Sequence, residues 1–235
     1  MSMVTSRIVA MGGGGFDAGS VGPHMEDLIL SLVPRERPRI CFVPTASADD
    51  RAIVANFYDT FSLRAEATWL PLFERRDTDL RTLILDQDIV YVWGGNTANM
   101  LAIWRIHGLD VILREAWARG IVLAGMSAGA ICWFEAGVTD SFGPGLTSFH
   151  EGLGLLPGSC CPHYDGEPLR RPTYRRLVGE GFPAGYAVDD AAALVFAGRD
   201  LEEVVATTPE ARAYRLERGA DGVVEVALPT RYLGA

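Results

Sequence analysis

Short apolar runs alternate with segments of mixed polarity through the first 135 residues of the chain. A short apolar run bounded by turn residues is typical of a buried strand, and we expect strands at 7–11, 39–43, 68–72, 88–93 and 121–124. The segments between these runs favour helices, which we expect at 23–33, 47–63, 78–85, 98–106 and 109–119, with Ser47 as the cap of the second. Strands that alternate with helices predict a mainly parallel sheet with helices on both faces.

The pattern changes after Phe134. Residues 135–166 are rich in Gly, Pro and other turn formers, and a helix is expected at 169–179. Short antiparallel strands are expected at 192–196, 213–216 and 223–228. The chain has 235 residues, of which 49% are hydrophobic, and this suits one globular domain spanning 1–235. We therefore predict an α/β fold with a doubly wound, mainly parallel sheet and a small antiparallel C-terminal extension.

The acidic balance of the chain excludes two classes of partner. Thirty Asp and Glu against 21 Lys and Arg give a net charge of -9, which leaves no electrostatic footprint for nucleic acid or an anionic membrane. The first apolar stretch is too short for the core of a signal peptide, and no apolar run approaches the length that spans a membrane. We therefore expect a cytoplasmic protein.

Four cysteines occur, at 41, 132, 160 and 161, and none belongs to a C-x-x-C pair. This spacing predicts neither a disulfide scaffold nor a zinc site. Cys41 and Cys132 lie inside apolar runs and are expected to be buried thiols. We expect neither a metal nor an organic cofactor.

The pentapeptide Gly125-Met126-Ser127-Ala128-Gly129 has the pattern G-x-S-x-G and follows the apolar run 121–124 directly. A helix start is expected after it, so Ser127 falls on a tight turn from strand to helix. Small flanking residues permit the strained backbone of a nucleophile elbow, and the helix N-terminus offers N–H groups to a developing oxyanion. The plainer interpretation is a Gly-rich turn with an incidental serine.

A serine nucleophile needs a base, and the chain has four histidines. His163 is favoured because it follows a short apolar stretch and Pro162, so it lies at a strand end as Ser127 does. His107 is expected to lie at a helix C-terminus, and His24 is a binding or a structural residue near the glycine-rich loop. No argument places His150 in or out of the site.

The acid that orients the base is expected to be Asp140, with Glu135, Asp165 and Glu167 left open. The order Ser, Asp, His is that of the α/β-hydrolases, in which further strand–helix units separate the three. Ser127 and His163 are only 36 residues apart, which leaves no room for two such units. The elbow therefore belongs to a fold whose topology differs from that of the α/β-hydrolases.

Three segments, 92–97 (Val-Trp-Gly-Gly-Asn-Thr), 125–130 (Gly-Met-Ser-Ala-Gly-Ala) and 162–164 (Pro-His-Tyr), resemble the peptidase E family in order and spacing. The family comprises aspartyl dipeptidases and the related cyanophycinases. The resemblance implies the flavodoxin-like fold of class I glutamine amidotransferases and a serine peptidase that removes N-terminal Asp from short peptides. By position, Ser127 and His163 match nucleophile and base, and Gly95 and Ala128 match the backbone donors of the oxyanion hole.

An aspartyl dipeptidase needs a cation for the acidic side chain of its substrate. Arg170, Arg171, Arg175 and Arg176 follow His163, and an Arg fork suits a carboxylate, although four Arg on a helix are also typical of a solvated face. We expect Arg171 to read the side chain, with Arg170 and Asn96 also in the substrate site. The expected partner is a short peptide with an acidic N-terminus; the oligomeric state stays open, a homo-oligomer included.

Three other functions are weighed against this one. The first is a peptidase of the same family with broader or carboxy-terminal specificity, and the second is an esterase or amidase with the same triad. The third is a nucleotide-binding module that uses the glycines at 12–15. That loop lacks both the G-x-G-x-x-G spacing and the Lys of a P-loop, which disfavours the third function.

Overall fold

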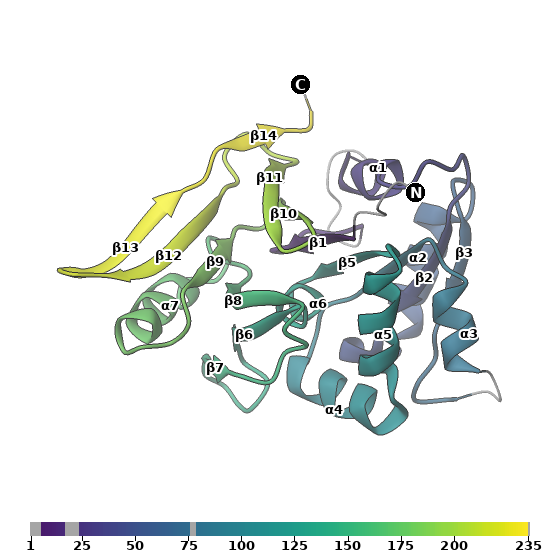
Figure 1. Ribbon diagram of the computed structural model, residues 1–235, viewed down its shortest axis with the longest axis horizontal. Helices are drawn as coiled ribbons and strands as arrows, with labels where there is room; N and C mark the ends of the chain where they lie inside the picture. Colours follow the sequence, from purple (N-terminus) through teal and green to yellow (C-terminus); the bar gives the residue numbers. More distant parts are fainter. Residues whose placement is uncertain (1–5, 17–23, 76–78, 235) are drawn as a thin grey trace.

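The computed structural model describes residues 6–16, 24–75 and 79–234, and these form two sheets (Figure 1). The main sheet has the order β14-β11-β10-β1-β5-β4-β2-β3. Its strands are β1 (Arg7–Met11), β2 (Arg39–Val43), β3 (Glu66–Trp69), β4 (Ile89–Val92), β5 (Val122–Met126), β10 (Ala192–Ala197), β11 (Asp200–Ala206) and β14 (Thr230–Tyr232). Strands β1 to β5 run parallel to one another, and β10 joins antiparallel to β1. The predicted parallel core is confirmed.

Helices cover both faces of the main sheet because its strands are apolar on both sides. Alternate residues such as Val9 and Phe42 pack with α1 (His24–Ser31) and α2 (Arg51–Phe61). Their neighbours, such as Ile8 and Val43, pack on the other face. That face is covered by α3 (Leu80–Leu85), α4 (Thr97–His107) and α5 (Leu109–Ala118). The sheet is therefore doubly wound, as predicted.

The second sheet has the order β13-β12-β9-β8-β6-β7. Its strands are β6 (Phe134–Thr139), β7 (Thr147–Phe149), β8 (Leu156–Cys161), β9 (Gly185–Val188), β12 (Ala213–Gly219) and β13 (Gly222–Ala227). Helix α7 (Arg170–Gly179) lies beside the β12–β13 hairpin, which extends away from the rest of the molecule (Figure 1). The larger apolar core cluster contains residues of both sheets, including Ile8 and Leu156.

The expected antiparallel strands near the C-terminus are confirmed as β10, β12 and β13. Two local expectations are wrong. The stretch 135–166, expected to consist of turns, instead forms β6, β7 and β8, and β6 pairs in parallel with β8. Helix α2 is capped by Asp50, whose carboxylate accepts the N–H groups of Ala52 and Ile53. Ser47 instead ends the short helix η1 (Thr45–Ser47), and its hydroxyl donates to Pro44 O at 2.9 Å.

The loops that follow β1, β4 and β5 meet at one edge of the main sheet, because these strands are parallel and β5 lies between the other two. In such sheets, ligands bind at the carboxyl ends of the strands. Among the described residues, no helix has both the length and the apolar character needed to cross a bilayer.

Candidate active site

Ser127 stands on a strained turn directly after β5. Its φ of 55° and ψ of −111° lie outside the regions that L residues ordinarily adopt, and helix α6 (Ala128–Ile131) begins at the next residue. The flanking glycines are required by close backbone contacts. A Cβ on Gly125 would lie 2.1 Å from Gly129 O, and a Cβ on Gly129 would lie 2.4 Å from Val92 O. The turn therefore has the geometry of the elbow that the pentapeptide predicted.

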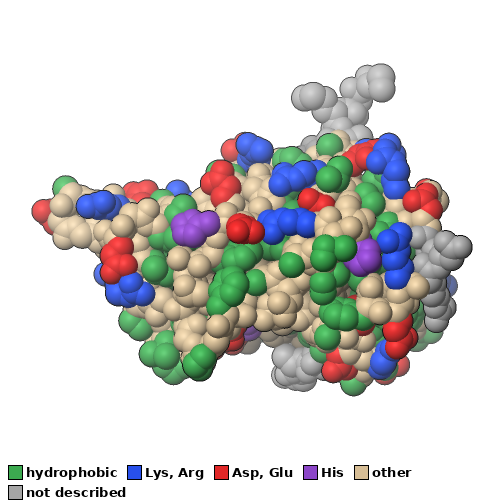
Figure 2. Space-filling model, turned by 90° about the horizontal axis from the view of Figure 1, so that it is seen from below, with side chains coloured by type: hydrophobic (Ala, Val, Ile, Leu, Met, Phe, Trp, Pro, Cys, Tyr) green, Lys and Arg blue, Asp and Glu red, His purple; other side chains and the backbone are tan. Residues whose placement is uncertain are grey.

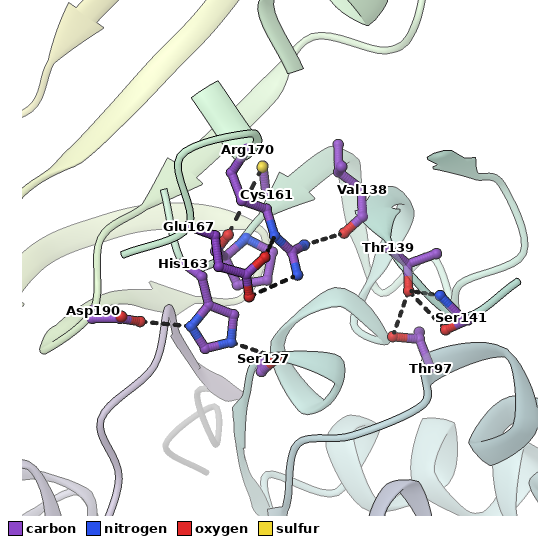
Figure 3. A network of polar contacts seen from close by, with 11 residues as sticks. Thr97, Ser127, Val138, Thr139, Ser141, Cys161, His163, Glu167, Arg170 and Asp190 are labelled. Carbon is purple, nitrogen blue, oxygen red and sulfur yellow. Dashed lines mark hydrogen bonds and ion pairs between the residues drawn. The ribbon is translucent and has the colours of Figure 1, made fainter. Parts of the chain in front are cut away.

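His163 lies beside Ser127 (Figure 3). It follows Pro162 after the end of β8, and its φ is 53°. The distance between His163 Nε2 and Ser127 Oγ is 2.8 Å. The opposite ring nitrogen, Nδ1, lies 2.6 Å from Asp190 Oδ1. A serine, a histidine and a carboxylate thus form one hydrogen-bonded series.

Asp190, not Asp140, is the carboxylate beside His163. It lies in the connection between β9 and β10, whereas Asp140 is exposed after the end of β6. The chain order is therefore Ser, His, Asp. The sequence holds a weak local signal here, because Asp190 lies two residues after the apolar run 185–188. No strand is expected at 185–188 from the sequence, so the acid that follows it is not among the candidates.

The three other open acids make different contacts. Glu135 Oε2 accepts the N–H of Gly158 at 2.8 Å. Asp165 Oδ1 accepts the N–H of Asp190 at 2.8 Å. Glu167 pairs with Arg170, whose Nε lies 2.8 Å from Oε2.

The loop after β4 lies against Ser127. A Cβ on Gly94 would be 3.1 Å from Ser127 Cβ, and the φ of Gly95 is 134°. Asn96 N donates to Ala46 O at 2.8 Å, which fixes the loop next to Gly95. Within the described part of the chain, neither Gly95 N–H nor Ala128 N–H donates to a protein acceptor. Both groups can therefore serve an oxygen on a bound molecule.

Asn96 is a helix cap in this structure. Its Oδ1 accepts the N–H of Asn99 at 2.8 Å, and its Nδ2 donates to Ser141 O at 3.1 Å. Ser141 in turn lies 2.7 Å from the hydroxyl of Thr139, within a small hydroxyl cluster that Figure 3 shows. The side chain expected in the substrate site thus anchors the loop after β4 to the end of β6.

The four arginines of the segment 170–176 all pair with carboxylates. Arg170 is buried and bonds Glu167 and Val138 O, each at 2.8 Å (Figure 3). Arg171 lies over Tyr164 and Tyr214, and it pairs with Glu225 at 2.6 Å. The other pairs are Arg175 with Glu225 and Arg176 with Glu180. Acidic and basic side chains are likewise interspersed over the face in Figure 2.

The remaining histidines lie in other settings. His107 ends α4 before Gly108, as expected, and its Nδ1 lies 3.1 Å from Arg75 Nη1. The ring of His150 packs edge-on against Phe182. The side chain of His24 lies outside the described residues. Within 6–16, 24–75 and 79–234, no three His, Cys, Asp or Glu side chains are grouped as metal ligands.

Burial raises the pKa values of one carboxyl group and two thiols near the site. It raises the pKa of Asp189 to about 6, and the charges of Asp165 and Asp190 act in the same direction. Burial also raises the pKa of the Cys132 and Cys161 thiols. The four cysteines are free and buried, so they are not nucleophiles for a substrate at the sheet edge.

The fold, the elbow and the Asp–His–Ser series are together typical of a hydrolase. The sequence pattern of peptidase family S51 matches residues 8–204, and the chain belongs to this family of peptidases. A relative in Bacillus subtilis (strain 168), described as the uncharacterized peptidase YgaJ, is 49% identical over 230 residues, which cover 97% of this chain and 99% of the relative.

Two solved structures share the fold. A peptidase from an acI-B1 Actinobacterium has a TM-score of 0.68 at 20% identity, covering 98% of this chain and 96% of its own. A protein from Listeria monocytogenes EGD-e, described as a peptidase E candidate, has a TM-score of 0.61 at 21% identity, covering 85% and 96%. The expected flavodoxin-like, class I glutamine amidotransferase-like architecture is confirmed.

Proposed function

We propose that the protein is a serine peptidase that hydrolyses short peptides through an acyl-enzyme on Ser127, with dipeptides carrying N-terminal Asp as preferred substrates. The observation that carries the proposal is the series of 2.6 Å and 2.8 Å contacts from Asp190 through His163 to Ser127 on a strained elbow. Membership of peptidase family S51 supports the same reaction class.

In this mechanism Asp190 accepts a hydrogen bond from His163 Nδ1 and so holds Nε2 unprotonated toward Ser127. His163 Nε2 takes the proton of Ser127 Oγ as the oxygen attacks the scissile carbonyl, and then gives it to the leaving amine. Water attacks the acyl-enzyme next, with His163 again as base. The second tetrahedral intermediate then collapses: the bond from Ser127 Oγ to the acyl carbon breaks, His163 returns the proton to Oγ, and the product carboxylic acid leaves.

The N–H groups of Gly95 and Ala128 would hold the oxyanion of each tetrahedral intermediate. Gly94 packs against Ser127, and this contact brings the neighbouring loop to the side of the nucleophile. Ala128 N–H belongs to the first residue of α6, where backbone donors lack partners inside the helix. Donors fixed before the reaction are worth most where charge develops.

The preference for Asp rests on the resemblance to peptidase E and on the description of the Listeria monocytogenes structure. Arg170 and Arg171 are the cations nearest to His163 along the chain, and each already holds a carboxylate. An acidic substrate group would have to compete with Glu167 or Glu225 for them. These ion pairs favour, as the second candidate, a peptidase of the same family with broader specificity.

A fluorophosphonate probe and a dipeptide panel test the proposal together. Mass spectrometry should show one covalently bound probe on the wild type and none on Ser127→Ala. Ser31→Ala is the control and should be labelled like the wild type, because Ser31 is an exposed serine on α1. Hydrolysis of an Asp-X dipeptide should be roughly 10²-fold or more above Asn-X, since only the charge differs. Labelling of Ser127→Ala would overturn the nucleophile, and equal cleavage of Asp-X and Asn-X would overturn the Asp preference alone.

A further inference from the structure

The carboxylate that would orient His163 is partly open to solvent, since the side chain of Asp190 is 41% exposed. An exposed Asp side chain ordinarily samples several rotamers, and each departure would release the ring of His163. The 2.6 Å contact with Nδ1 therefore needs some feature that limits the carboxylate to one orientation.

Two glycines from distant parts of the chain flank this carboxylate. A Cβ on Gly13 would lie 2.0 Å from Asp190 Oδ1 and 2.6 Å from His163 Nδ1. A Cβ on Gly166 would lie 2.2 Å from Asp190 Oδ2. Each distance is far below van der Waals contact, so both carboxylate oxygens occupy space that any other residue at 13 or 166 would fill.

The backbone at these two positions does not itself require glycine. Gly14, the next residue in the same loop, has a φ of 83° and so favours glycine for its conformation. Neither Gly13 nor Gly166 has a φ in the left-handed region. The steric reason for glycine at 13 and 166 is therefore the carboxylate and the imidazole, not the local fold.

The main chain of Asp190 is held so that it cannot move away from the glycines. Its N–H donates to Asp165 Oδ1 at 2.8 Å. The next N–H, of Ala191, donates to Gly13 O at 3.0 Å. A clash at either glycine must therefore be relieved by rotating the carboxylate or by breaking these bonds.

We propose that Gly13 and Gly166 form a slot for the carboxylate of Asp190, and that they act as positioning residues for the acid–base pair. This inference rests on the proposed function and assigns a role to the glycine-rich loop 12–15. Because Gly13 has no side chain, the loop leaves room for the carboxylate of Asp190 and the ring of His163.

A double-mutant cycle between Gly166 and Asp190 tests the slot. Gly166→Ala should lower kcat by about 10²-fold with little change in KM, because a displacement of about 1 Å in a reacting group has that effect. In the Asp190→Ala background, where the clashing oxygens are absent, Gly166→Ala should change the residual kcat by less than about twofold. Gly145→Ala is the control, since a Cβ there meets nothing within 4 Å and its φ is ordinary.

Additive effects in the cycle, or a Gly166→Ala enzyme with normal kcat, would overturn the slot. If Gly166→Ala fails to fold, the double variant should fold, because the oxygens that a Cβ would meet are gone; an unfolded double variant would also overturn the slot. Absence of hydrolysis in the wild type would contradict the proposed function instead.

A readout independent of activity separates the two failures. In ¹⁵N-histidine spectra, the wild type and Gly145→Ala should show the ring proton of His163 on Nδ1. Gly166→Ala should show a shift toward the Nε2–H tautomer, because the acceptor on Nδ1 has turned away. An unchanged tautomer in Gly166→Ala would contradict the slot even in an inactive protein.

Discussion

Ser127 is enclosed by backbone at the edge of the main sheet, whereas His163 and Asp190 stand on connections of the second sheet, where hydrogen bonds hold them. Around Ser127, Gly125 and Gly129 approach neighbouring carbonyl oxygens so closely that no Cβ fits. Around Asp190, a carboxylate of Asp165 and a carbonyl of Gly13 hold the main chain. Substitutions in the closely packed region around Ser127 should therefore reduce the stability of the fold. Substitutions in the hydrogen-bonded region around Asp190 should instead reduce activity.

The largest expected effect is on the polar side. Asp190→Asn should lower kcat by about 10⁴-fold, because an amide in place of the carboxylate favours the wrong tautomer of the base. Asp140→Asn is the matched control and should keep wild-type kinetics, since Asp140 is exposed and lies after β6. Steady-state kinetics on the best dipeptide of the panel measure both. A strong defect in Asp140→Asn beside a mild one in Asp190→Asn would reverse the assignment.

On the packed side, Gly129→Ala should destabilise the fold by about 3 kcal/mol, because its Cβ would meet a fixed backbone oxygen rather than a flexible side chain. The nearest atom is Val92 O at 2.4 Å. Urea unfolding followed by circular dichroism measures the change, with Gly145→Ala expected within about 0.5 kcal/mol of wild type. An unchanged midpoint for Gly129→Ala would show that the turn can relax, and the contrast between the two sides would weaken.

A smaller effect is expected at Asp165, which holds the main chain of the acid. Asp165→Ala leaves the N–H of Asp190 without its acceptor and should lower kcat about tenfold. Asp165→Asn keeps an oxygen in that place and should restore most of the activity. Equal losses in both variants would mean that the charge, and not the hydrogen bond, is what matters at this position.

The smallest effect concerns Asp189, next to the acid. Its folded pKa of about 6 exceeds the usual 3.8, so its ionisation opposes folding increasingly as pH rises from about 4 to 6. Asp189→Asn should therefore leave stability unchanged below pH 4 and raise it by about 1 kcal/mol above pH 6.

Thermal unfolding from pH 4 to 8 measures this difference. The charged groups that act on Asp189 are Asp165, Asp190 and Arg171, and the backbone N–H of Arg212 donates to its carboxylate at 2.9 Å. They are common to both proteins, so the difference between the two curves isolates the single carboxyl. A variant less stable than the wild type at pH 8 would contradict the burial argument.

The sequence predicted the parts of this molecule that local patterns encode. The elbow of Ser127 depends on five consecutive residues, and the strands of the parallel core are short apolar runs. The position of His163 after Pro162, at the end of such a run, likewise favours it as the base. The structure brings the two side chains to 2.8 Å, although their roles in catalysis stay proposals.

The apolar run before Asp190 does not by itself identify this residue as the partner of His163. Its place beside His163 arises because β8 pairs with β9 in parallel, and β10 returns to the main sheet beside β1. These pairings join segments far apart in the chain, and no local pattern encodes them. The arginines illustrate the same limit: their clustering was visible, but the partners Glu167 and Glu225 emerge only from the folded arrangement.

Ser127 and His163 share a feature whose consequence is evolutionary. Both have φ near 55° without being glycine, and such a conformation opposes folding by about 1–3 kcal/mol per residue. A lineage freed from selection for hydrolysis would gain stability by drifting to glycine at either position. Retention of serine and histidine at these sites in any descendant is therefore a sign that selection still acts on the chemistry.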